Sequence, residues 1–147
     1  MKQNIDLVAF DLGNVLCKVD EVSAAKNLAA IANQQWEDVH EIVFGQDAKS
    51  RFESGKITFD DHAHNAIKTL RLNMSFIEFT KIYNSVLIPS ENMFPIVTQI
   101  SKTHRIALAS NTSEPHWKYA QKFLPFSSQL NPVIVSYLAG TLKPCPL

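Results

Sequence analysis

Cysteine, glycine and charge of one sign are all scarce in this chain of 147 residues. The two cysteines, Cys17 and Cys145, have neither the spacing of a metal site nor the number that a disulfide framework needs. The 14 basic residues balance the 14 acidic ones without a long run of either sign, which argues against nucleic acid and membrane surfaces as partners. The low glycine count, four residues, excludes a fibrous or low-complexity protein.

Long hydrophobic runs are missing as well. The first apolar stretch is interrupted at Asp6 and Asp11, so it is neither a signal peptide nor a membrane span. Together with the absence of a disulfide framework, this predicts a cytoplasmic protein with no membrane partner. Hydrophobic residues make up 46% of the chain, which is enough for one domain, with or without an inserted subdomain.

The most informative stretch lies near the start of the chain. Residues 7–10 are a short apolar run of the kind that forms a strand buried on both faces, and Asp11 follows at its carboxyl end. Open α/β sheets bind their ligands at these strand ends. Gly13 and Asn14 both tolerate positive φ, so the chain can turn sharply and leave the carboxylate exposed. We therefore expect Asp11 to be a nucleophile, a cation ligand or both.

Residues 20–88 have the periodicity of helices joined by short loops. Asp20 is expected to cap the first helix, and Gly45 is expected to end the second one in the C′ position. Pro89 marks the end of the helical region. The pattern predicts a helical subdomain inserted between the first strand and the rest of the chain.

Two helix starts within this segment carry capping boxes. In a capping box, a hydroxyl and a carboxyl group three residues apart each accept a hydrogen bond from the other residue's backbone N–H. Thr58 with Asp61 is an acidic variant, and Ser75 with Glu78 is a regular one. Apolar residues follow each box at helical spacing, so we expect a helix to begin after Thr58 and another after Ser75.

After Pro89 the chain alternates between helices and strands again. Asn92 is expected to cap a helix that has Pro95 in its first turn, and an apolar strand is expected over residues 105–109. Ser110 and Asn111 follow that strand as Asp11 follows the first one. Polar residues at such positions, next to the start of a helix, are suited to binding an anion.

The order of three motifs along the chain is distinctive. Asp11 follows the first strand, Ser110-Asn111-Thr112 follows a later one, and Lys143-Pro144 comes near the end. This order resembles the haloacid dehalogenase-like (HAD) superfamily of hydrolases, and the variant Phe-Asp-Leu-Gly-Asn-Val looks most like its helical-capped sugar-phosphate phosphatases. The resemblance covers essentially the whole chain.

The resemblance implies an α/β fold with an inserted domain. A partial Rossmann-like parallel sheet, the HAD core, would comprise residues 1–19 and 89–147. An all-helical cap would comprise residues 20–88. The core would present the three motifs at the carboxyl ends of its strands, and the cap would select the substrate.

The resemblance also implies a Mg²⁺-dependent phosphatase that acts on a small phosphorylated metabolite through an aspartyl-phosphate intermediate. Asp11 would be the nucleophile and would bind magnesium together with the backbone carbonyl of Gly13. Ser110 and Asn111 would bind the phosphate, and Lys143 would neutralise charge on Asp11 and on the phosphate. Many family members carry an aspartate, which exchanges protons with the leaving group and with water, at the position of Gly13.

Two other functions stay open. Because Gly13 cannot exchange protons, the chain is also compatible with a non-catalytic remnant of the HAD fold that binds phosphate or a protein partner. A haloacid dehalogenase is a third option, since a halide leaves without a proton. At the level of single residues, Asp11 can simply cap a turn, Ser110 can belong to an ordinary helix-entry loop, and Lys143 can be a solvated side chain.

The family's fourth acidic motif, which completes its magnesium site, would follow Lys143-Pro144 and is not found in this sequence. The chain therefore resembles a C-terminally truncated member. Without the later strands of the family fold, the strand over residues 7–10 would lie at an edge of the sheet, where it can pair with another chain. We expect a homodimer or strand exchange through this edge, or poor solubility.

Histidines and an arginine complete the set of candidates. His62 and His64 lie two residues apart on an expected helix and point in different directions, so we expect a helix surface rather than a metal site. His116, which comes soon after Ser110, is a candidate for contact with the substrate. In the cap, residues 44–47 and 51–56 are expected to face the crevice, and Arg51 is a candidate for binding a second phosphate or a sugar hydroxyl group.

Overall fold

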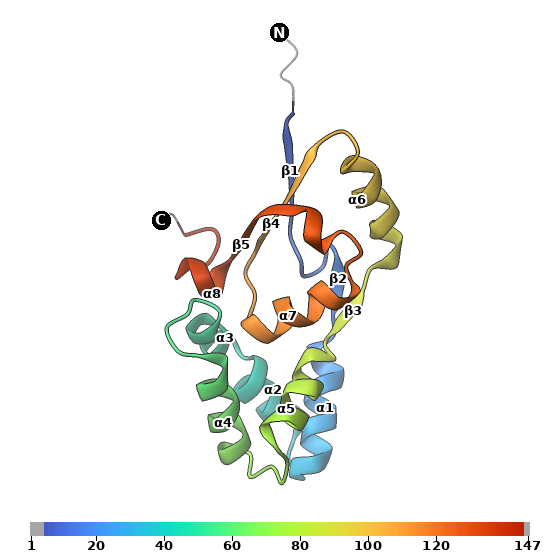
Figure 1. The fold of residues 1–147 in the computed structure, drawn as a ribbon. Helices are drawn as coiled ribbons and strands as arrows, with labels where there is room; N and C mark the ends of the chain where they lie inside the picture. The colour runs from blue at the N-terminus through green and yellow to red at the C-terminus, as the bar shows by residue number, and fades with distance from the viewer. Residues whose placement is uncertain (1–4, 146–147) are drawn as a thin grey trace.

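The computed structural model describes residues 5–145, so the outermost residues of the two predicted core segments, 1–4 and 146–147, lie outside it. The described chain forms an α/β unit and a helical unit, which a two-stranded ribbon connects (Figure 1). The predicted fold class, a parallel sheet with an inserted helical cap, is therefore confirmed.

Within residues 5–145, a three-stranded parallel sheet forms the centre of the α/β unit, with the strand order β1-β4-β5. These strands are β1 (Leu7–Phe10), β4 (Arg105–Ser110) and β5 (Leu130–Val135). Phe10 lies opposite Leu108, and Ser110 lies opposite Val135. This register brings the carboxyl ends of all three strands to the same edge of the sheet.

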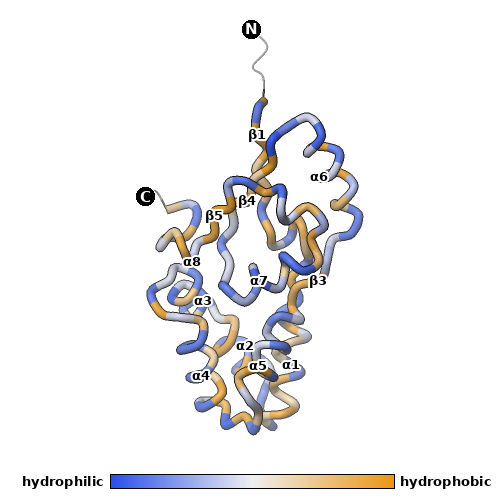
Figure 2. Tube along the Cα trace, viewed as in Figure 1, coloured by the Kyte–Doolittle hydropathy of each residue, from blue (hydrophilic) through white to orange (hydrophobic). Residues whose placement is uncertain are grey.

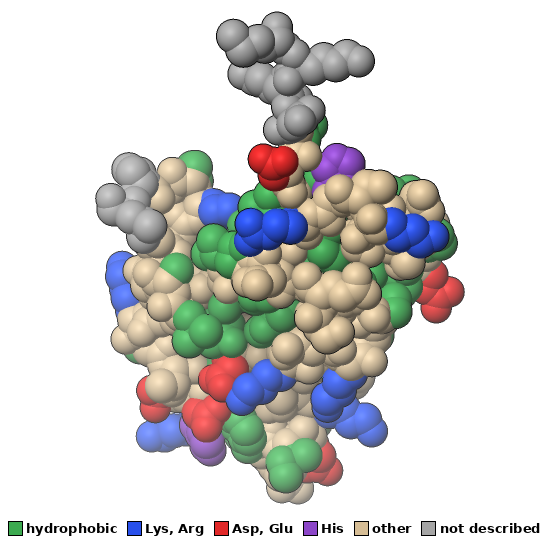
Figure 3. Space-filling model, turned by 45° about the horizontal axis from the view of Figure 1, so that its top comes forward, with side chains coloured by type: hydrophobic (Ala, Val, Ile, Leu, Met, Phe, Trp, Pro, Cys, Tyr) green, Lys and Arg blue, Asp and Glu red, His purple; other side chains and the backbone are tan. Residues whose placement is uncertain are grey.

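The strand β1 lies at the side of this sheet and pairs only with β4 among the described strands. Leu7 is 39% exposed, and Phe10 is the one buried residue of β1. The predicted position of this strand at an edge of the sheet is confirmed among the described strands. The prediction of a strand buried on both faces is wrong, because Leu7 and Ala9 are exposed. Pairing of this edge with a second copy of the chain stays a prediction. Figure 3 shows hydrophobic side chains at the surface around the α/β unit. Ile134 of β5, at the opposite side of the sheet, is 53% exposed.

Short helices complete the α/β unit. They are η1 (Glu91–Met93), α6 (Phe94–Ile100), α7 (Glu114–Phe123), η2 (Ser127–Gln129) and α8 (Ser136–Ala139). Pro95 lies in the first turn of α6 as predicted, but Asn92 does not cap this helix. Asn92 lies inside η1, because the chain already turns helically where the Met93 N–H donates to the carbonyl of Ser90, and α6 continues from that turn.

Five helices form the helical unit in the part of the chain that the structure describes. They are α1 (Glu21–Ala32), α2 (Trp36–Phe44), α3 (Gln46–Phe52), α4 (Phe59–Thr69) and α5 (Phe76–Asn84). The Asp20 side chain caps α1 as predicted, and both predicted capping boxes form at the starts of α4 and α5. Hydrophobic residues recur along these helices and along the strands of the sheet (Figure 2). None of the described helices has the length and apolar character that crossing a membrane requires.

Gly45 does not end α2 in a left-handed conformation as predicted, because its φ is −61° and its ψ is 154°. This residue instead stands between α2 and α3, where it is the last residue before the second helix begins. A Cβ atom at this position would lie 2.2 Å from the backbone oxygen of Glu41. Glycine is therefore needed here for a close approach of the backbone, not for a positive φ.

The helical region also ends earlier than predicted. The helix α5 stops at Asn84, and β3 (Leu87–Pro89) forms an antiparallel ribbon with β2 (Cys17–Val19). Pairing with β2 outweighs the local helical periodicity of this stretch, as tertiary contacts often do in short segments. The ribbon carries the chain into the helical unit and back out of it (Figure 1).

A buried contact fixes the helical unit against the start of α7. The Tyr83 hydroxyl donates a hydrogen bond of 3.1 Å to the Ser113 hydroxyl, and the Tyr83 ring stacks on the His116 ring with 4.2 Å between centroids. Burial lowers the pKa of His116 to about 4, so its ring is neutral at neutral pH. The His116 Nε2 atom lies 3.1 Å from the Tyr83 carbonyl oxygen and donates to it as the neutral ring does.

Candidate active site

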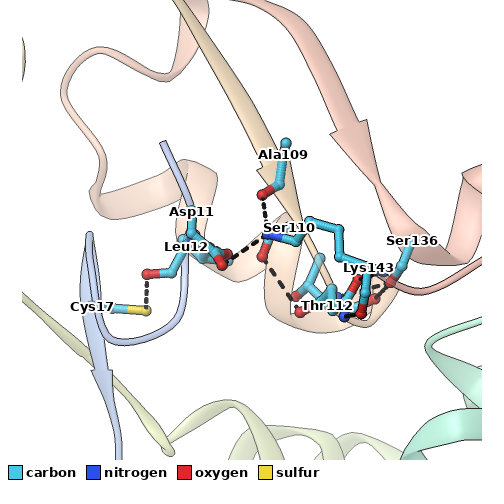
Figure 4. Close-up of polar contacts among 9 residues, drawn as sticks. Asp11, Leu12, Cys17, Ala109, Ser110, Thr112, Ser136 and Lys143 are labelled. Atoms are coloured by element: carbon cyan, nitrogen blue, oxygen red, sulfur yellow. Dashed lines mark hydrogen bonds and ion pairs between the residues drawn. The ribbon is translucent and has the colours of Figure 1, made fainter. Parts of the chain in front are cut away.

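Asp11 and Lys143, which are 132 positions apart in the sequence, form an ion pair at the carboxyl end of β1 (Figure 4). Lys143 Nζ donates to Asp11 Oδ2 at 2.9 Å and to the backbone oxygen of Ala109 at 2.7 Å. The other carboxylate oxygen of Asp11 accepts the backbone N–H of Leu12 at 2.7 Å. The structure thus brings together two residues that the sequence predicts for one site.

The surroundings of Asp11 favour its ionised form. Partial burial on its own raises the pKa of this carboxyl group. Hydrogen bonds from Lys143 and the Leu12 N–H, the nearby Ser110 hydroxyl and the positive charge of Lys143 outweigh that effect and hold the pKa below its usual value. A deprotonated carboxylate is the form that a nucleophile or a cation ligand requires.

Asn111 has a role that its sequence position did not reveal. Its side-chain oxygen accepts the Lys143 backbone N–H at 2.8 Å, and its side-chain nitrogen donates to the Lys143 carbonyl at 3.0 Å. This pair of hydrogen bonds holds the backbone of Lys143 beside the end of β4. Asn111 is therefore a positioning residue for Lys143, and its predicted contact with phosphate stays a prediction.

The loop after β4 is held from inside by Ser136. The Ser136 hydroxyl accepts the Thr112 N–H at 3.0 Å and donates to the Thr112 carbonyl at 3.1 Å (Figure 4). Ser110 is 4% exposed, and its hydroxyl is one of the groups that lower the pKa of Asp11. The Ser110 hydroxyl donates to the Asn111 carbonyl at 3.4 Å, so both Ser110 and Thr112 are held by contacts within or beneath the loop.

The turn after Asp11 is tight, as predicted, although only one of the two expected residues adopts positive φ. Asn14 has a φ of 59°. The Leu12 carbonyl accepts the backbone N–H groups of Leu16 and Cys17, at 2.9 and 3.1 Å. Gly13 lies within this turn, where a Cβ atom would come to 3.4 Å from Val19.

The donors available for a metal ion are few. Among residues 5–145 there is no group of three or more His, Cys, Asp or Glu side chains that could hold one. The predicted donors are the Asp11 carboxylate and the Gly13 carbonyl. Because Mg²⁺ keeps several waters and is commonly held by one or two carboxylates together with substrate phosphate, this donor set fits Mg²⁺ when a phosphate is bound.

A cavity of about 340 Å³ lies beside Lys143, between the α/β unit and the helical unit. Residues of the three motif loops line one wall, namely Leu12, Gly13, Asn14, Asn111, Thr112, Leu142 and Lys143. Residues of α1 and α3 line the other wall, with Glu21, Gln46, Lys49 and Glu53 among them. A smaller cavity of about 170 Å³ is lined by Ser110, and Lys143 borders both. The larger cavity is wide enough for a small phosphorylated molecule.

The helical wall carries several ionisable groups. Glu53 lies within residues 51–56, which were expected to face the crevice, whereas Glu21 and Lys49 were not expected there. Lys49 pairs with Glu21, whose other carboxylate oxygen lies 3.3 Å from His40 Nε2. Burial raises the pKa of Glu53 to about 7, because the nearby positive charge of Lys49 offsets it only in part and Glu21 adds to it. The i, i+4 spacing of Lys49 and Glu53 was the available signal, since such residues share one face of a helix.

Arg51 does not line either of these cavities and is exposed. It lies two residues from Lys49 and two from Glu53, and residues two apart point to different sides of a helix. Lys49, and not Arg51, is therefore the basic residue of the cap that lines the cavity.

His62 and His64 do not form a metal site, but His62 is not at the surface either. His62 is 5% exposed, and its Nε2 atom lies 3.1 Å from the Val43 carbonyl. The surface prediction is wrong for His62 because its ring packs on Phe52 of α3, with 4.4 Å between centroids. His64 is exposed, as predicted. His116 borders the cavity, but its Nε2 atom is already hydrogen-bonded to the Tyr83 carbonyl oxygen.

Solved structures with this fold are numerous, although no protein-family model matches the sequence and no curated protein sequence resembles it significantly. The HAD family enzyme BT-2542 of Bacteroides thetaiotaomicron, in complex with magnesium and inorganic phosphate, superposes with a TM-score of 0.80 at 21% identity, over 96% of this chain and 73% of that one. A HAD-like family hydrolase of Porphyromonas gingivalis gives 0.74 at 22% identity, over 96% and 71%.

A more distant similarity links the chain to an enzyme of different chemistry. The L-2-haloacid dehalogenase of Xanthobacter autotrophicus, with chloropropionic acid covalently bound, superposes with a TM-score of 0.61 at 16% identity, over 96% of this chain and 60% of that one. All three similar proteins share the α/β unit with its helical insertion. From the parallel sheet, the inserted helices and these superpositions, we conclude that the chain has the fold of the haloacid dehalogenase-like hydrolases.

Proposed function

We propose that the protein is a Mg²⁺-dependent phosphatase of the HAD type, which hydrolyses a small phosphate monoester through an aspartyl-phosphate. The observation that carries this proposal is the Asp11–Lys143 ion pair at the end of β1, because Lys143 and the residues that follow Asp11 line the cavity between the two units. A paired, ionised carboxylate at the strand end of an α/β sheet is suited to attack on a bound electrophile.

The chemistry proceeds in two displacements. An oxygen of Asp11 forms a bond to phosphorus, while the bond from phosphorus to the ester oxygen breaks and leaves its electron pair on that oxygen. Water then attacks the phosphorus of the aspartyl-phosphate, and the bond from phosphorus to Asp11 breaks, which releases phosphate and restores the carboxylate. Splitting the hydrolysis in this way replaces one difficult step by two easier ones.

The other residues of the loops stabilise the transferring group. Lys143 neutralises negative charge on Asp11 and on the phosphoryl oxygens, and the Ser110 hydroxyl and the N–H groups before α7 donate hydrogen bonds to them. Asp11 and the Gly13 carbonyl would hold Mg²⁺, which supplies further charge neutralisation when bound. The HAD family enzyme BT-2542, whose solved complex contains magnesium and inorganic phosphate, supports the choice of Mg²⁺ and a phosphate ester as ligands.

The proposal is tested by assaying the purified chain with an aryl phosphate and Mg²⁺, with and without a chelator. We expect turnover that the chelator abolishes and that Asp11→Asn lowers by more than about 1,000-fold, as loss of a nucleophile does. Asp38→Asn, at an exposed position on α2, is the matched control and should keep full activity. Absence of turnover by the unmodified chain would instead support a non-catalytic remnant, and halide release from a haloacid would support a dehalogenase.

A further inference from the structure

The proposed reaction needs a group that exchanges protons, and the loop after Asp11 does not provide one. An alkoxide is a poor leaving group unless its oxygen is protonated as the bond to phosphorus breaks. Gly13 has no side chain that could carry a proton. The Lys143 ammonium group is hydrogen-bonded to Asp11 and to the Ala109 carbonyl, and the His116 ring is stacked on Tyr83. A proton donor must therefore come from another side of the cavity.

We infer that Glu53, on the helical wall, is this catalytic acid and base, and that the substrate is a small alkyl phosphate. The inference rests on the proposed function. Glu53 lines the same cavity as Gly13, Asn111 and Lys143, and it approaches from the opposite unit. A guest whose phosphoryl group lies at Asp11 and Lys143 would extend its ester oxygen and carbon chain toward the helical wall.

Glu53 is free to serve a guest molecule. Among the hydrogen bonds formed within residues 5–145, none involves the Glu53 carboxyl group, whereas the Glu21 carboxylate is held by Lys49 and His40. The backbone of Glu53 is fixed, because its N–H donates to the Lys49 carbonyl at 2.8 Å at the end of α3. The carboxyl group is thus presented by an ordered turn but has no partner of its own there.

Burial is the main reason that Glu53 favours its protonated form, and the charged and titratable groups around it do not reverse this effect. Lys49 of α3 is the nearby cation, but its ammonium group pairs with Glu21 of α1. Tyr83 of α5 is buried and uncharged, and its pKa is raised by burial and by the negative charge of Glu53. His116 of α7 is neutral, because burial lowers its pKa to about 4. A carboxyl group whose pKa is near 7 can both give and take a proton at neutral pH.

Protons and bonds balance over the two steps. As the bond from phosphorus to the alkyl oxygen breaks, the Glu53 proton moves to that oxygen, which leaves an alcohol and a Glu53 carboxylate. When water attacks the aspartyl-phosphate, the carboxylate takes a proton from that water. Phosphate is released, Asp11 is restored and Glu53 is protonated again.

Substrates with different leaving groups distinguish a catalytic role of Glu53 from a purely structural one. Nitrophenolate departs without a proton, so Glu53→Gln should still release nitrophenolate from p-nitrophenyl phosphate in a burst equal to the enzyme concentration, followed by slow turnover. With glycerol 2-phosphate the same variant should show no burst and should be slower than wild type by about 100-fold or more, the usual contribution of general acid–base catalysis. Glu53→Asp should recover part of this loss, and the exposed Glu91→Gln should match wild type.

Two results would overturn the inference. One is found if the wild-type protein turns over both esters and Glu53→Gln slows the first step equally with both, or with neither. The proposed function would then stand without the role of Glu53. The other is a ¹³C carboxyl resonance, assigned to Glu53 by its absence from Glu53→Gln, that titrates near the ordinary glutamate value instead of near 7. A wild-type protein without any turnover would overturn both the inference and the proposed function.

Discussion

The two walls of the cavity are built by different means. On the α/β wall, hydrogen bonds between residues far apart in sequence fix each group, as in the contacts of Lys143 with Asp11, Ala109 and Asn111. On the helical wall, Lys49 and Glu21 form an ion pair, and the carboxyl group of Glu53 beside them has no hydrogen-bond partner among the described residues. The first wall is ordered before a ligand arrives, whereas the second keeps an ionisable group free for one.

This difference suggests a division of labour. A wall with fixed donors and a fixed cation suits a charge that is the same in every substrate, such as the phosphoryl group. A wall with a free carboxyl group suits proton exchange and contacts that vary with the leaving group. Variants on the α/β wall should therefore damage the reaction with any phosphate ester, and variants on the helical wall should discriminate between esters.

The largest effect in this comparison is expected for Lys143→Met. The variant removes the cation that neutralises Asp11 and the transferring phosphoryl group, so kcat should fall by about 100- to 1,000-fold with alkyl and aryl phosphates alike. Steady-state kinetics measure the loss. Lys118→Met, which removes an exposed lysine that pairs with Glu114, is the control and should leave kcat unchanged. A loss confined to one class of ester would show that the two walls do not divide the work in this way.

A smaller effect is expected for Asn111→Ala, because this variant leaves Lys143 in place but releases its backbone. Misplacement of a catalytic group by about 1 Å can lower the rate by about 100-fold, and we expect a fall in kcat of about 10- to 100-fold. Amide hydrogen exchange gives the second readout, since the Lys143 N–H loses its acceptor and should exchange faster. Reduced kcat with unchanged exchange at Lys143 would assign Asn111 to phosphate binding alone.

The smallest effect concerns the stability of the fold and the helical wall. The pKa of Glu53 is about 7 in the folded chain and that of an ordinary glutamate is 4.5, so between these values the folded chain binds the extra proton. Stability is therefore lost as pH rises through this window. Glu53→Gln removes the titration, and its melting temperature should exceed that of wild type by several degrees at pH 8 but not at pH 4.5. Equal differences at the two pH values would contradict the raised pKa.

The α/β wall could be predicted from sequence for a physical reason. Its functional residues come directly after apolar strands in the sequence. Because parallel strands bring such positions to a common edge of the sheet, Asp11 and Ser110 were expected near each other. The bonds that Asn111 makes to the Lys143 backbone span 32 positions in the chain, and no local pattern encodes them. They determine where Lys143 lies, although the sequence identified the residue itself.

The helical wall was harder to predict, because it depends on which helix faces meet the α/β unit. Local signals placed the caps of α1, α4 and α5 correctly, since capping is a contact between near neighbours. The same signals did not show that Glu21 and Lys49 face the cavity. Within residues 51–56, which were expected at the crevice, they did not distinguish Glu53, which lines the cavity, from Arg51, which does not. They also missed β3, whose strand conformation comes from pairing with β2, because the whole helical unit separates these two strands in the sequence.

The most direct measurement is a rapid acid quench of the protein during turnover of a phosphate ester, followed by peptide mass spectrometry. Acid preserves an acyl phosphate long enough to be located. We expect the mass of one phosphoryl group on the peptide that contains Asp11, and no such peptide from Asp11→Asn. Turnover in which the added phosphoryl group lies on another residue, or on none, would contradict the assignment of Asp11 as the nucleophile.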